Sequence, residues 1–504
     1  MLLNVILLIA VFKKYLPGYP IGWDVPYYIS RAKYFLIEGV LGKRAASIII
    51  GAAVSKITGL SLVTVFYYYS IGLIVSLAGV TALLASKIFS GIMRHVSFMV
   101  LFTFGIWSVK YFTLSITTLD NALALILSIL LLYVLTFEKL KYKTFLVLCI
   151  SVLIAVAHFE TLMFTIMLLF IYTILVSIFL HMNPGTFISK TKHSLTALGT
   201  LIVVGSFYWL DQIQNTLGSY INPTLRSKNA SISYTDNSTL REFFRLSHSG
   251  TASTGQLFLY IFAVVAIVFY LFRIPKEKER NVLGLFALFL ATQAVLFVTV
   301  FRGAIPTNRA TALLPISLLV SFAVVVILDT LKSRTSLLFL LPIFWLFLLT
   351  TQPITDQVAY ARRFPLSIEP KTYQALQELS EYSQSEAFPE FVIATNISTT
   401  EKAASAYFNL WHNWIISVLP LPSDGYRYCV YFGDIHDILQ RKPTIRGGED
   451  TEYSLISNYS YNACSLSAKD APIFFVDGMY NVSETHLLDN NLLTQVAEGL
   501  YILQ

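Results

Sequence analysis

Long apolar runs, separated by short polar breaks, dominate the first 351 residues of the chain. A helix that crosses a membrane needs about 20 mostly apolar residues, and most of these runs approach that length. They predict eleven spans: a short one over 1–12, then runs near 62–86, 96–113, 119–137, 143–157, 160–182, 195–212, 256–273, 283–301, 311–329 and 335–351. The pattern therefore predicts a polytopic α-helical membrane domain over residues 1–351.

Two long loops interrupt this pattern, at 15–60 and at 213–255. Within the first loop, 29–37 mixes basic residues with aromatic and aliphatic ones, and 45–54 is apolar. Amphipathic segments of this length can lie in the plane of the membrane surface. We expect two interfacial helices in this loop.

From about residue 352 the apolar runs become shorter and more strand-like. PEFVIAT (389–395), YRYCVYF (426–432) and APIFFV (471–476) predict buried strands. Residues 399–414, between the first two of these segments, have helical spacing. A second helix is expected to begin at Gly433–Asp434, between the second and third segments. Alternation of strands and helices favours a small mixed or parallel sheet. We expect a soluble α/β domain over 352–504.

The charge distribution supports this division and excludes a nucleic-acid binder. The chain is 13% charged, whereas soluble domains carry about 25%, and its mean hydropathy is +0.65. Residues 1–351 carry 27 Lys and Arg against 11 Asp and Glu, and residues 352–504 carry 9 against 18. The net charges are therefore +16 and −9. The basic excess belongs to the membrane part, where loop cations set orientation.

The breaks between the runs alternate in charge, which predicts their sides. One set is basic and is expected in the cytoplasm: Lys87 and Arg94; Lys139, Lys141 and Lys143; Lys190 and Lys192; Arg273, Lys276, Lys278 and Arg280; Lys332 and Arg334. This places the amino terminus inside and the tail outside, with Lys13 and Lys14 as the clear exception. Five N-x-S/T sequons, at Asn229, Asn237, Asn396, Asn458 and Asn481, all fall in segments placed outside. There, Cys429 and Cys464 can either pair or stay reduced.

Asp24 is one of few carboxylates in the membrane half, and aromatic residues surround it in GYPIGWDVPYYISR (18–31). An acid beside lipid is costly unless it has a use. Asp24 precedes Val25–Pro26, and proline restricts the residue before it. The functional interpretation is a catalytic acid held in a fixed orientation. The structural one is a helix N-cap, with Pro26 in the first turn.

Asp120 stands at the predicted outer start of a span, in TTLDNALA (117–124). Taken alone it is explained by helix capping, because an acid at an N-terminus complements the helix dipole. Together with Asp24 it can bind a divalent cation, or position an acceptor hydroxyl and a phosphate-bearing donor. These two alternatives stay open.

Three further positions carry candidate chemistry. His158 and Glu160 occupy a tight hairpin (AHFET) and are either a buried polar pair, an interface anchor or part of a cavity wall. Arg302 and Arg309 flank GAIPTN on the predicted outer side, against the usual bias. Guanidinium groups suit phosphate or pyrophosphate. The alternative is that both side chains reach toward lipid phosphates in general.

These residues together resemble a known family. A first loop with a lone acid among aromatics (WDVPYY), two interfacial helices, the TLDNALA acid and an arginine before ALLP (312–315) are similar to GT-C superfamily glycosyltransferases. The likeness is to the protein O-mannosyltransferase, aminoarabinose transferase and oligosaccharyltransferase branch, in prokaryotic and more specifically archaeal form. The matching motifs are short, and the likeness covers the eleven-span plan and the tail.

The resemblance implies an inverting transfer of a sugar from a polyprenyl (dolichyl) phosphate to a hydroxyl on a protein, lipid or glycan, at the outer face of the cell membrane. It implies that Asp24 is the catalytic acid that activates the acceptor. Asp120 would be the second acid near donor phosphate or metal, and Arg309, with Arg302, the donor-phosphate ligand. The chain lacks a paired acid at 24, a DxD at 120 and a WWDYG-like run in the tail. These departures argue against a metal-dependent oligosaccharyltransferase. A transporter of lipid-linked saccharide and a non-catalytic scaffold with an ectodomain are the alternatives.

Overall fold

The structure is a computed structural model, and it describes twelve stretches of the chain. These are residues 2–15, 25–39, 45–137, 140–179, 184–211, 213–214, 279–302, 368–385, 390–395, 427–432, 471–477 and 492–503, with single residues near 265, 322–329, 414–419 and 479. The chain divides into two compact units: residues 1–15, 43–47 and 68–358 form the first, and residues 16–42, 48–67 and 359–504 the second.

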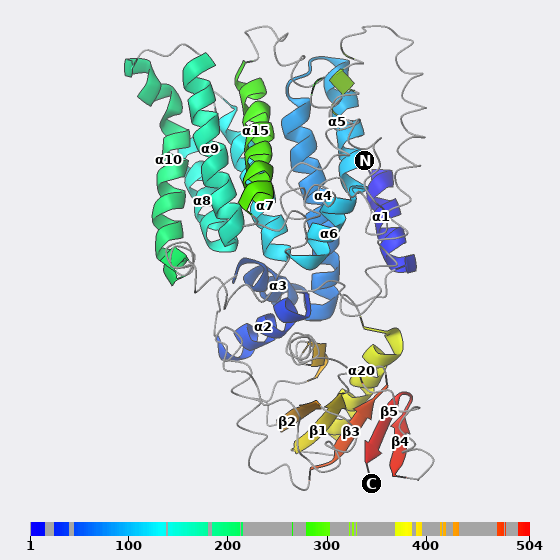
Figure 1. The fold of residues 1–504 in the computed structure, drawn as a ribbon. Helices are drawn as coiled ribbons and strands as arrows, with labels where there is room; N and C mark the ends of the chain where they lie inside the picture. The colour runs from blue at the N-terminus through cyan, green and yellow to red at the C-terminus, as the bar shows by residue number, and fades with distance from the viewer. Residues whose placement is uncertain are drawn as a thin grey trace. The chain divides into compact units, whose positions relative to one another are not determined.

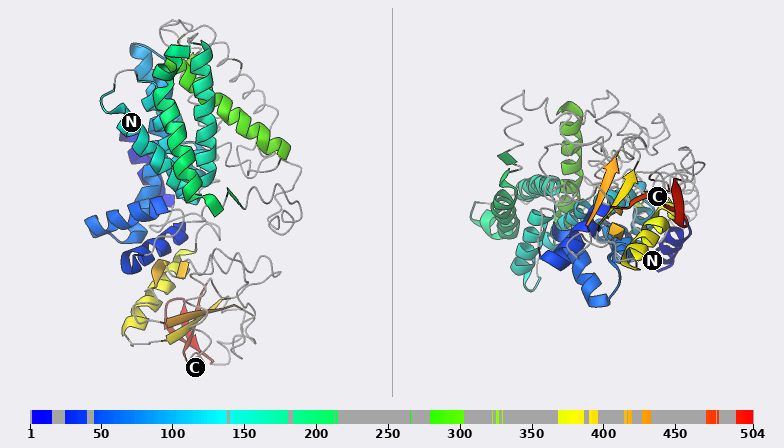
Figure 2. Two further views of the ribbon diagram at one scale, coloured as in Figure 1. Left: turned by 90° about the vertical axis from the view of Figure 1, so that its left-hand side faces the viewer. Right: turned by 90° about the horizontal axis from the view of Figure 1, so that it is seen from below.

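The first unit is a bundle of mostly apolar helices (Figure 1). Its described helices are α1 (Leu2–Tyr15), α4 (Leu62–Ser86, shared with the second unit), α5 (Ile92–Ile106), α6 (Val109–Thr117), α7 (Leu119–Leu135), α8 (Lys143–Ala157), α9 (Phe159–Phe179), α10 (Pro184–Tyr208) and α15 (Glu279–Arg302). Among the described residues, α4 and α9 are long and apolar enough to cross a membrane, and α5, α7 and α8 are shorter apolar helices. Helices α8, α9 and α10 run side by side in both figures (Figure 2).

Most of the predicted spans in this region match helices. The runs at 62–86 and 143–157 coincide with α4 and α8, and those at 119–137, 160–182 and 283–301 match α7, α9 and α15 to within a few residues. Helix α10 begins at Pro184, eleven residues before the start of the span predicted at 195–212. The runs at 256–273, 311–329 and 335–351 lie almost wholly outside the described residues, so the count of eleven spans stays a prediction.

The run predicted at 96–113 is wrong as a single helix, because it breaks at Trp107–Ser108. The amide of Trp107 bonds back to the carbonyl oxygens of Thr103 and Gly105, which closes α5. The hydroxyl of Ser108 then accepts a hydrogen bond from the amide of Tyr111 and starts α6. Serine at an N-cap satisfies a helix donor that would otherwise lack a partner. The chain therefore ends one helix and begins another with no glycine or proline at Trp107 or Ser108 themselves.

Small residues and buried polar bonds join the helices of the first unit. Gly105 of α5 faces Ala78 of α4 so closely that an added Cβ would lie 2.8 Å from the Cβ of Ala78. Small residues at such crossings let backbones approach, which is the usual means of helix association in lipid. The indole of Trp209 donates to the carbonyl oxygen of Ala155 at 2.7 Å and ties the end of α10 to α8. The bundle is thus fixed at several crossings.

The second unit contains the two helices expected in the first loop, α2 (Val25–Glu38) and most of α3 (Ala45–Thr58). Phe66, at the start of α4, is fully buried. Its ring stacks on Tyr28 with centroids 6.4 Å apart, and it fills the space beside Gly51. The helical character of both predicted segments is confirmed. Their place in the membrane interface stays a prediction.

The tail carries a five-stranded mixed sheet in the order β2-β1-β3-β5-β4. Strands β1 (Glu390–Thr395), β2 (Arg427–Phe432) and β3 (Ile473–Val476) are parallel to one another. Each lies within one of the three strand segments predicted at 389–395, 426–432 and 471–476. Strands β4 (Leu493–Ala497) and β5 (Leu500–Leu503) form an antiparallel hairpin that adds to β3. The helices predicted at 399–414 and from 433 lie almost entirely outside the described residues.

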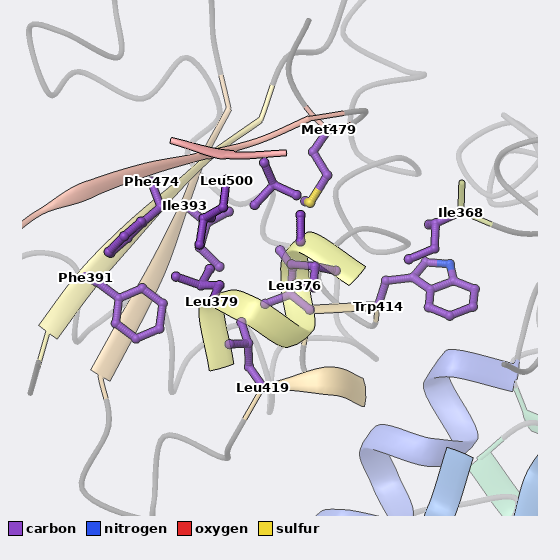
Figure 3. Close-up of a cluster of buried hydrophobic side chains, with 13 residues drawn as sticks. Ile368, Leu376, Leu379, Phe391, Ile393, Trp414, Leu419, Phe474, Met479 and Leu500 are labelled. Carbon is purple, nitrogen blue, oxygen red and sulfur yellow. The ribbon is translucent and has the colours of Figure 1, made fainter. Parts of the chain in front are cut away.

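Helix α20 (Pro370–Ser385) supplies much of the core of the tail (Figure 3). Its buried Leu376 and Leu379 meet Ile393 of β1, Phe474 of β3 and Leu500 of β5. The helix has a polar composition overall, but its apolar residues recur at helical spacing on one face, as expected of a helix that covers a sheet. The tail is therefore a helix-on-sheet layer with its own hydrophobic core.

Candidate functional site

Asp120 has no exposed surface and is the more deeply buried of the two described candidate acids, Asp120 and Glu160. It lies in the first turn of α7, where the N-cap residue Thr118 makes no side-chain cap bond. The Oδ1 atom of Asp120 instead accepts a hydrogen bond from the amide of Ser47 at 2.8 Å. Ser47 is the third residue of α3, and the first four amides of a helix have no partner within it. Asp120 therefore caps a second helix rather than its own.

Two helix starts meet at the Asp120 carboxyl group. Asp120 lies in the first turn of α7 and bonds to the first turn of α3, so the positive ends of two helix dipoles face this group. A buried carboxylate is costly unless it is hydrogen-bonded, and the Ser47 amide provides such a bond. The hydroxyl of Ser47 also lies 3.3 Å from the phenol oxygen of Tyr69 on α4. These residues tie the start of α3 to α4 and α7.

His158 has a comparable role between α8 and α9. It is buried, in extended backbone at the end of α8, and its Nδ1 accepts a hydrogen bond from the amide of Thr161 at 3.4 Å. Thr161 is the third residue of α9, so the imidazole acts as an N-cap. An Nδ1 that accepts leaves the proton of a neutral ring on Nε2. The structure thus gives His158 a capping role at this hairpin.

A short polar chain links this hairpin to the start of α7. The hydroxyl of Thr161 donates to Oδ1 of Asn121, the residue after Asp120, at 2.5 Å. Two turns further along α7 and one turn further along α9, the hydroxyls of Ser128 and Thr165 lie 2.6 Å apart. Asp120 and His158 therefore belong to neighbouring helix starts, and Asn121 and Thr161 join these starts directly. Glu160, the next acid on α9, is half-buried.

The remaining candidates lie at or beyond the limits of the described residues. Helix α2 begins at Val25, immediately after Asp24, with Pro26 in its first turn as expected. Asp24 itself and Arg309 lie outside the described residues. Arg302 is the last residue of α15, and only its backbone is described. The convergence of Asp24, Asp120 and Arg309 on one cavity stays a prediction.

Four polar residues that the sequence reasoning did not single out belong to this region: Ser47, Tyr69, Asn121 and Thr161. The spacing of His158 and Thr161 is the N-cap to N3 spacing, so that bond has a local signal. The Asp120–Ser47 bond joins residues 73 apart and has none. In the described part of the chain, no three His, Cys, Asp or Glu residues lie together in a way that could hold a metal ion.

The described elements are an apolar helix bundle, a pair of helices in the first loop and a tail with a mixed sheet. The fold is similar to that of the crystal structure of ArnT from Cupriavidus metallidurans in the apo state. ArnT is a GT-C aminoarabinose transferase. The present chain is 10% identical to it, with a TM-score of 0.50, over 100% of this chain and 97% of that one. No family model and no curated protein sequence matches the chain.

The comparison confirms the GT-C fold expected from the first-loop and TLDNALA motifs. It covers the helical part and the tail together, since the whole chain is matched. At this identity the likeness extends to the fold alone. The branch within GT-C and an archaeal source stay predictions.

Proposed function

We propose that the protein is a membrane glycosyltransferase that takes a sugar from a lipid-linked donor. The observation that carries this proposal is the end-to-end likeness to ArnT, because it includes both the helical part and the tail. The donor is a polyprenyl (dolichyl) phosphate sugar. The acceptor is a hydroxyl on a protein, lipid or glycan, presented on the extracytoplasmic face.

In the proposed reaction, Asp24 removes a proton from the acceptor hydroxyl. The acceptor oxygen attacks the anomeric carbon from the side opposite the phosphate, so a new C–O bond forms with inversion. The bond from that carbon to the phosphate oxygen breaks, and polyprenyl phosphate leaves with the electron pair. General-base assistance of this kind contributes about 10²–10⁴-fold in rate.

Arg309, with Arg302, is proposed to hold the donor phosphate. A guanidinium group can donate two parallel hydrogen bonds to phosphate oxygens, and its positive charge offsets the charge that develops as the phosphate leaves. Arg302 ends α15, and Arg309 follows seven residues later in the chain. A lipid-linked substrate would enter from the bilayer at this level.

Asp120 is proposed to act on the site through α3. Its carboxylate holds the amide of Ser47 in the first turn of α3, and α3 follows the loop and helix that begin at Asp24. The structure therefore favours a positioning role for Asp120 over direct contact with the reacting atoms. His158 likewise positions α9 through the amide of Thr161.

The positions of the ionisable residues favour a transferase over a transporter of lipid-linked saccharide. Transporter sites place such residues near the middle of the membrane, at interrupted helices. Helix α4 contains no Asp, Glu, Lys, Arg or His, and in α7, α8 and α9 each such residue is the first or second of its helix: Asp120, Lys143 and Glu160.

The test is replacement of Asp24 in cells that depend on the protein for a surface glycan. Asp24→Asn should abolish the glycan while the protein remains in the membrane at normal level. Asp211→Asn, an exposed acid beyond the end of α10, is the matched control and should keep wild-type glycan. Normal glycan in the Asp24→Asn strain would overturn the assignment of the base.

A further inference from the structure

The helix ends opposite Asp120 and His158 carry a concentration of positive charge. The segments 87–95, 136–143 and 189–193 together contain seven Lys and Arg residues and a single acid, Glu138. Four of the described cations of these segments are called the basic rim here: Lys87, Arg94, Lys143 and Lys192. Lys87 follows the end of α4, Arg94 and Lys143 lie in the first turns of α5 and α8, and Lys192 lies a little over two turns into α10. The end of α4 and the starts of α5, α8 and α10 are at the upper end of the helices in Figure 1.

The basic rim is a separate place from the candidate site. Thr136, which contacts Lys87, follows Asp120 by 16 residues along α7, and a rise of 1.5 Å per residue places them about 24 Å apart. The hydrocarbon core of a bilayer is about 30 Å thick. If Asp120 lies near one membrane surface, the basic rim lies near the other.

Two lysines of the rim are held firmly by the end of α7. The Nζ atom of Lys87 donates to the hydroxyl of Thr136 at 2.7 Å and lies 3.5 Å from the centre of the Phe137 ring. The Nζ atom of Lys143 donates to the carbonyl oxygens of Leu135 and Phe137. The negative end of the α7 dipole and a ring face thus fix two cations at a defined position.

The other members of the rim extend the charge outward. Arg94 and Lys192 are exposed, and the Nδ1 atom of His193 lies 3.5 Å from the hydroxyl of Thr144, next to Lys143. Burial, followed by the charges of Arg94 and Lys143, lowers the pKa of Lys87 to about 8. The cations therefore repel one another, and an anion bound among them would relieve that repulsion.

Apolar side chains flank the same ends. Ile92 is 78% exposed, Tyr142 69% and Phe145 65%. Tyr142 has a φ of +61°, in the left-handed region that a bulky residue rarely adopts. Such a conformation is kept only where its surroundings enforce it, often at functional positions. Exposed aromatic residues beside cations are typical of the headgroup level of a membrane.

We propose that the basic rim binds the phosphate of an anionic phospholipid in the leaflet opposite the candidate site. Fixed Lys87 and Lys143 form the base of the site, while Arg94 and Lys192 reach the phosphate oxygens. Ile92 and Phe145 contact the acyl chains. Basic pockets between helix ends are suited to anionic headgroups in this way. The proposal does not depend on the proposed transferase activity.

The test uses the full-length protein in nanodiscs of phosphatidylcholine mixed with phosphatidylglycerol. After release into detergent, native mass spectrometry counts the lipids that stay bound. The wild type should retain phosphatidylglycerol over phosphatidylcholine. Arg94→Gln with Lys192→Gln, both at exposed positions, should lower that retention about tenfold or more, since each basic residue near an anionic surface contributes about a factor of five.

Lys13→Gln with Lys14→Gln is the matched control, because it removes the same charge from exposed positions at the end of α1. It should change retention less than about twofold. Equal retention of the two lipids by the wild type would overturn the proposal, and so would equal losses in the rim and control variants. Displacement of the lipid by soluble glycerol phosphate at matched concentration would assign the site to a soluble phosphate and refute the lipid.

Discussion

Replacing Asp120 by alanine removes the acceptor for the Ser47 amide in a place that water does not reach. The carboxylate is fully buried, and its Oδ1 lies 2.8 Å from the Ser47 nitrogen. In the Asp120→Ala variant the first turn of α3 loses this cap, and the positive ends of α3 and α7 lose the charge that they both face. We expect a large loss of stability that begins at α3.

The size of the loss follows from two contributions. A buried amide without a partner costs about 1–3 kcal/mol. A charge at a helix N-terminus contributes about 0.3–1 kcal/mol, and up to about 2 when it is partly buried. Asp120→Ala should therefore lower the free energy of unfolding by about 2–4 kcal/mol. Asp120→Asn keeps an acceptor oxygen at the same reach and loses only the charge, so about 1 kcal/mol is expected.

Thermal unfolding in detergent micelles, together with hydrogen exchange of the α3 amides, measures both effects. Asp120→Ala should lower the unfolding temperature more than Asp120→Asn does. The backbone amide hydrogen of Ser47 should exchange faster in Asp120→Ala than in the wild type or in Asp120→Asn. Asp211→Ala at an exposed position should change stability by less than about 0.5 kcal/mol. Wild-type stability and exchange in Asp120→Ala would refute the capping role. Asp120→Asn with wild-type stability and no transfer activity would return Asp120 to the reacting centre.

Three further variants test other parts of the structure. Lys87→Met concerns pH: the pKa of Lys87 is about 8 in the folded protein against 10.5 for an ordinary lysine. Between these two pKa values the unfolded chain binds more protons than the folded protein, so the free energy of unfolding of the wild type should rise with pH across that window. This rise should flatten in Lys87→Met and persist in Lys192→Met. Gly51→Ala would place a Cβ 2.6 Å from Cε2 of the buried Phe66 and should cost about 1–3 kcal/mol. Gly72→Ala, with open space around it, should be neutral or stabilising, and equal effects of the two would contradict the packing. Thr161→Val removes the hydroxyl that donates to Asn121 and lies 3.2 Å from Nδ1 of His158, and it keeps the backbone amide bond to His158. It should lower the unfolding temperature by an amount equivalent to about 1–2 kcal/mol, while an unchanged temperature would rule out a role for the polar chain.

The sequence predicted elements best where lipid restricts the alternatives. A run of about 15–25 apolar residues between basic breaks has few ways to satisfy its backbone except as a helix, and α4 and α8 coincide with their predicted runs. The break at Trp107–Ser108 has no glycine or proline, and it depends on a serine cap that the apolar pattern hides. The β4–β5 hairpin was missed, although its turn contains Gly499 with φ +72° between two short strands. A short turn of that kind is a hairpin signal.

The candidate site shows the same division between local and distant interactions. The N-cap role of His158 toward Thr161 is local and can be predicted from spacing. The partner of Asp120 could not be predicted, because Ser47 lies 73 residues away and donates through its backbone. Charge counting identified Asp120 as an acid that something must stabilise. The structure adds the second helix start that its carboxyl group contacts, and this contact supports the proposal that Asp120 positions α3.

The most direct test of the central claim is product formation by the purified, reconstituted protein. Proteoliposomes would receive a panel of polyprenyl-phosphate sugars with hydroxyl-bearing acceptors, and both products, glycosylated acceptor and free polyprenyl phosphate, would be quantified. The account predicts equal amounts of the two products with wild-type protein for at least one donor, and none with Asp24→Asn. Movement of intact donor across the bilayer without release of polyprenyl phosphate, unchanged in Asp24→Asn, would contradict it.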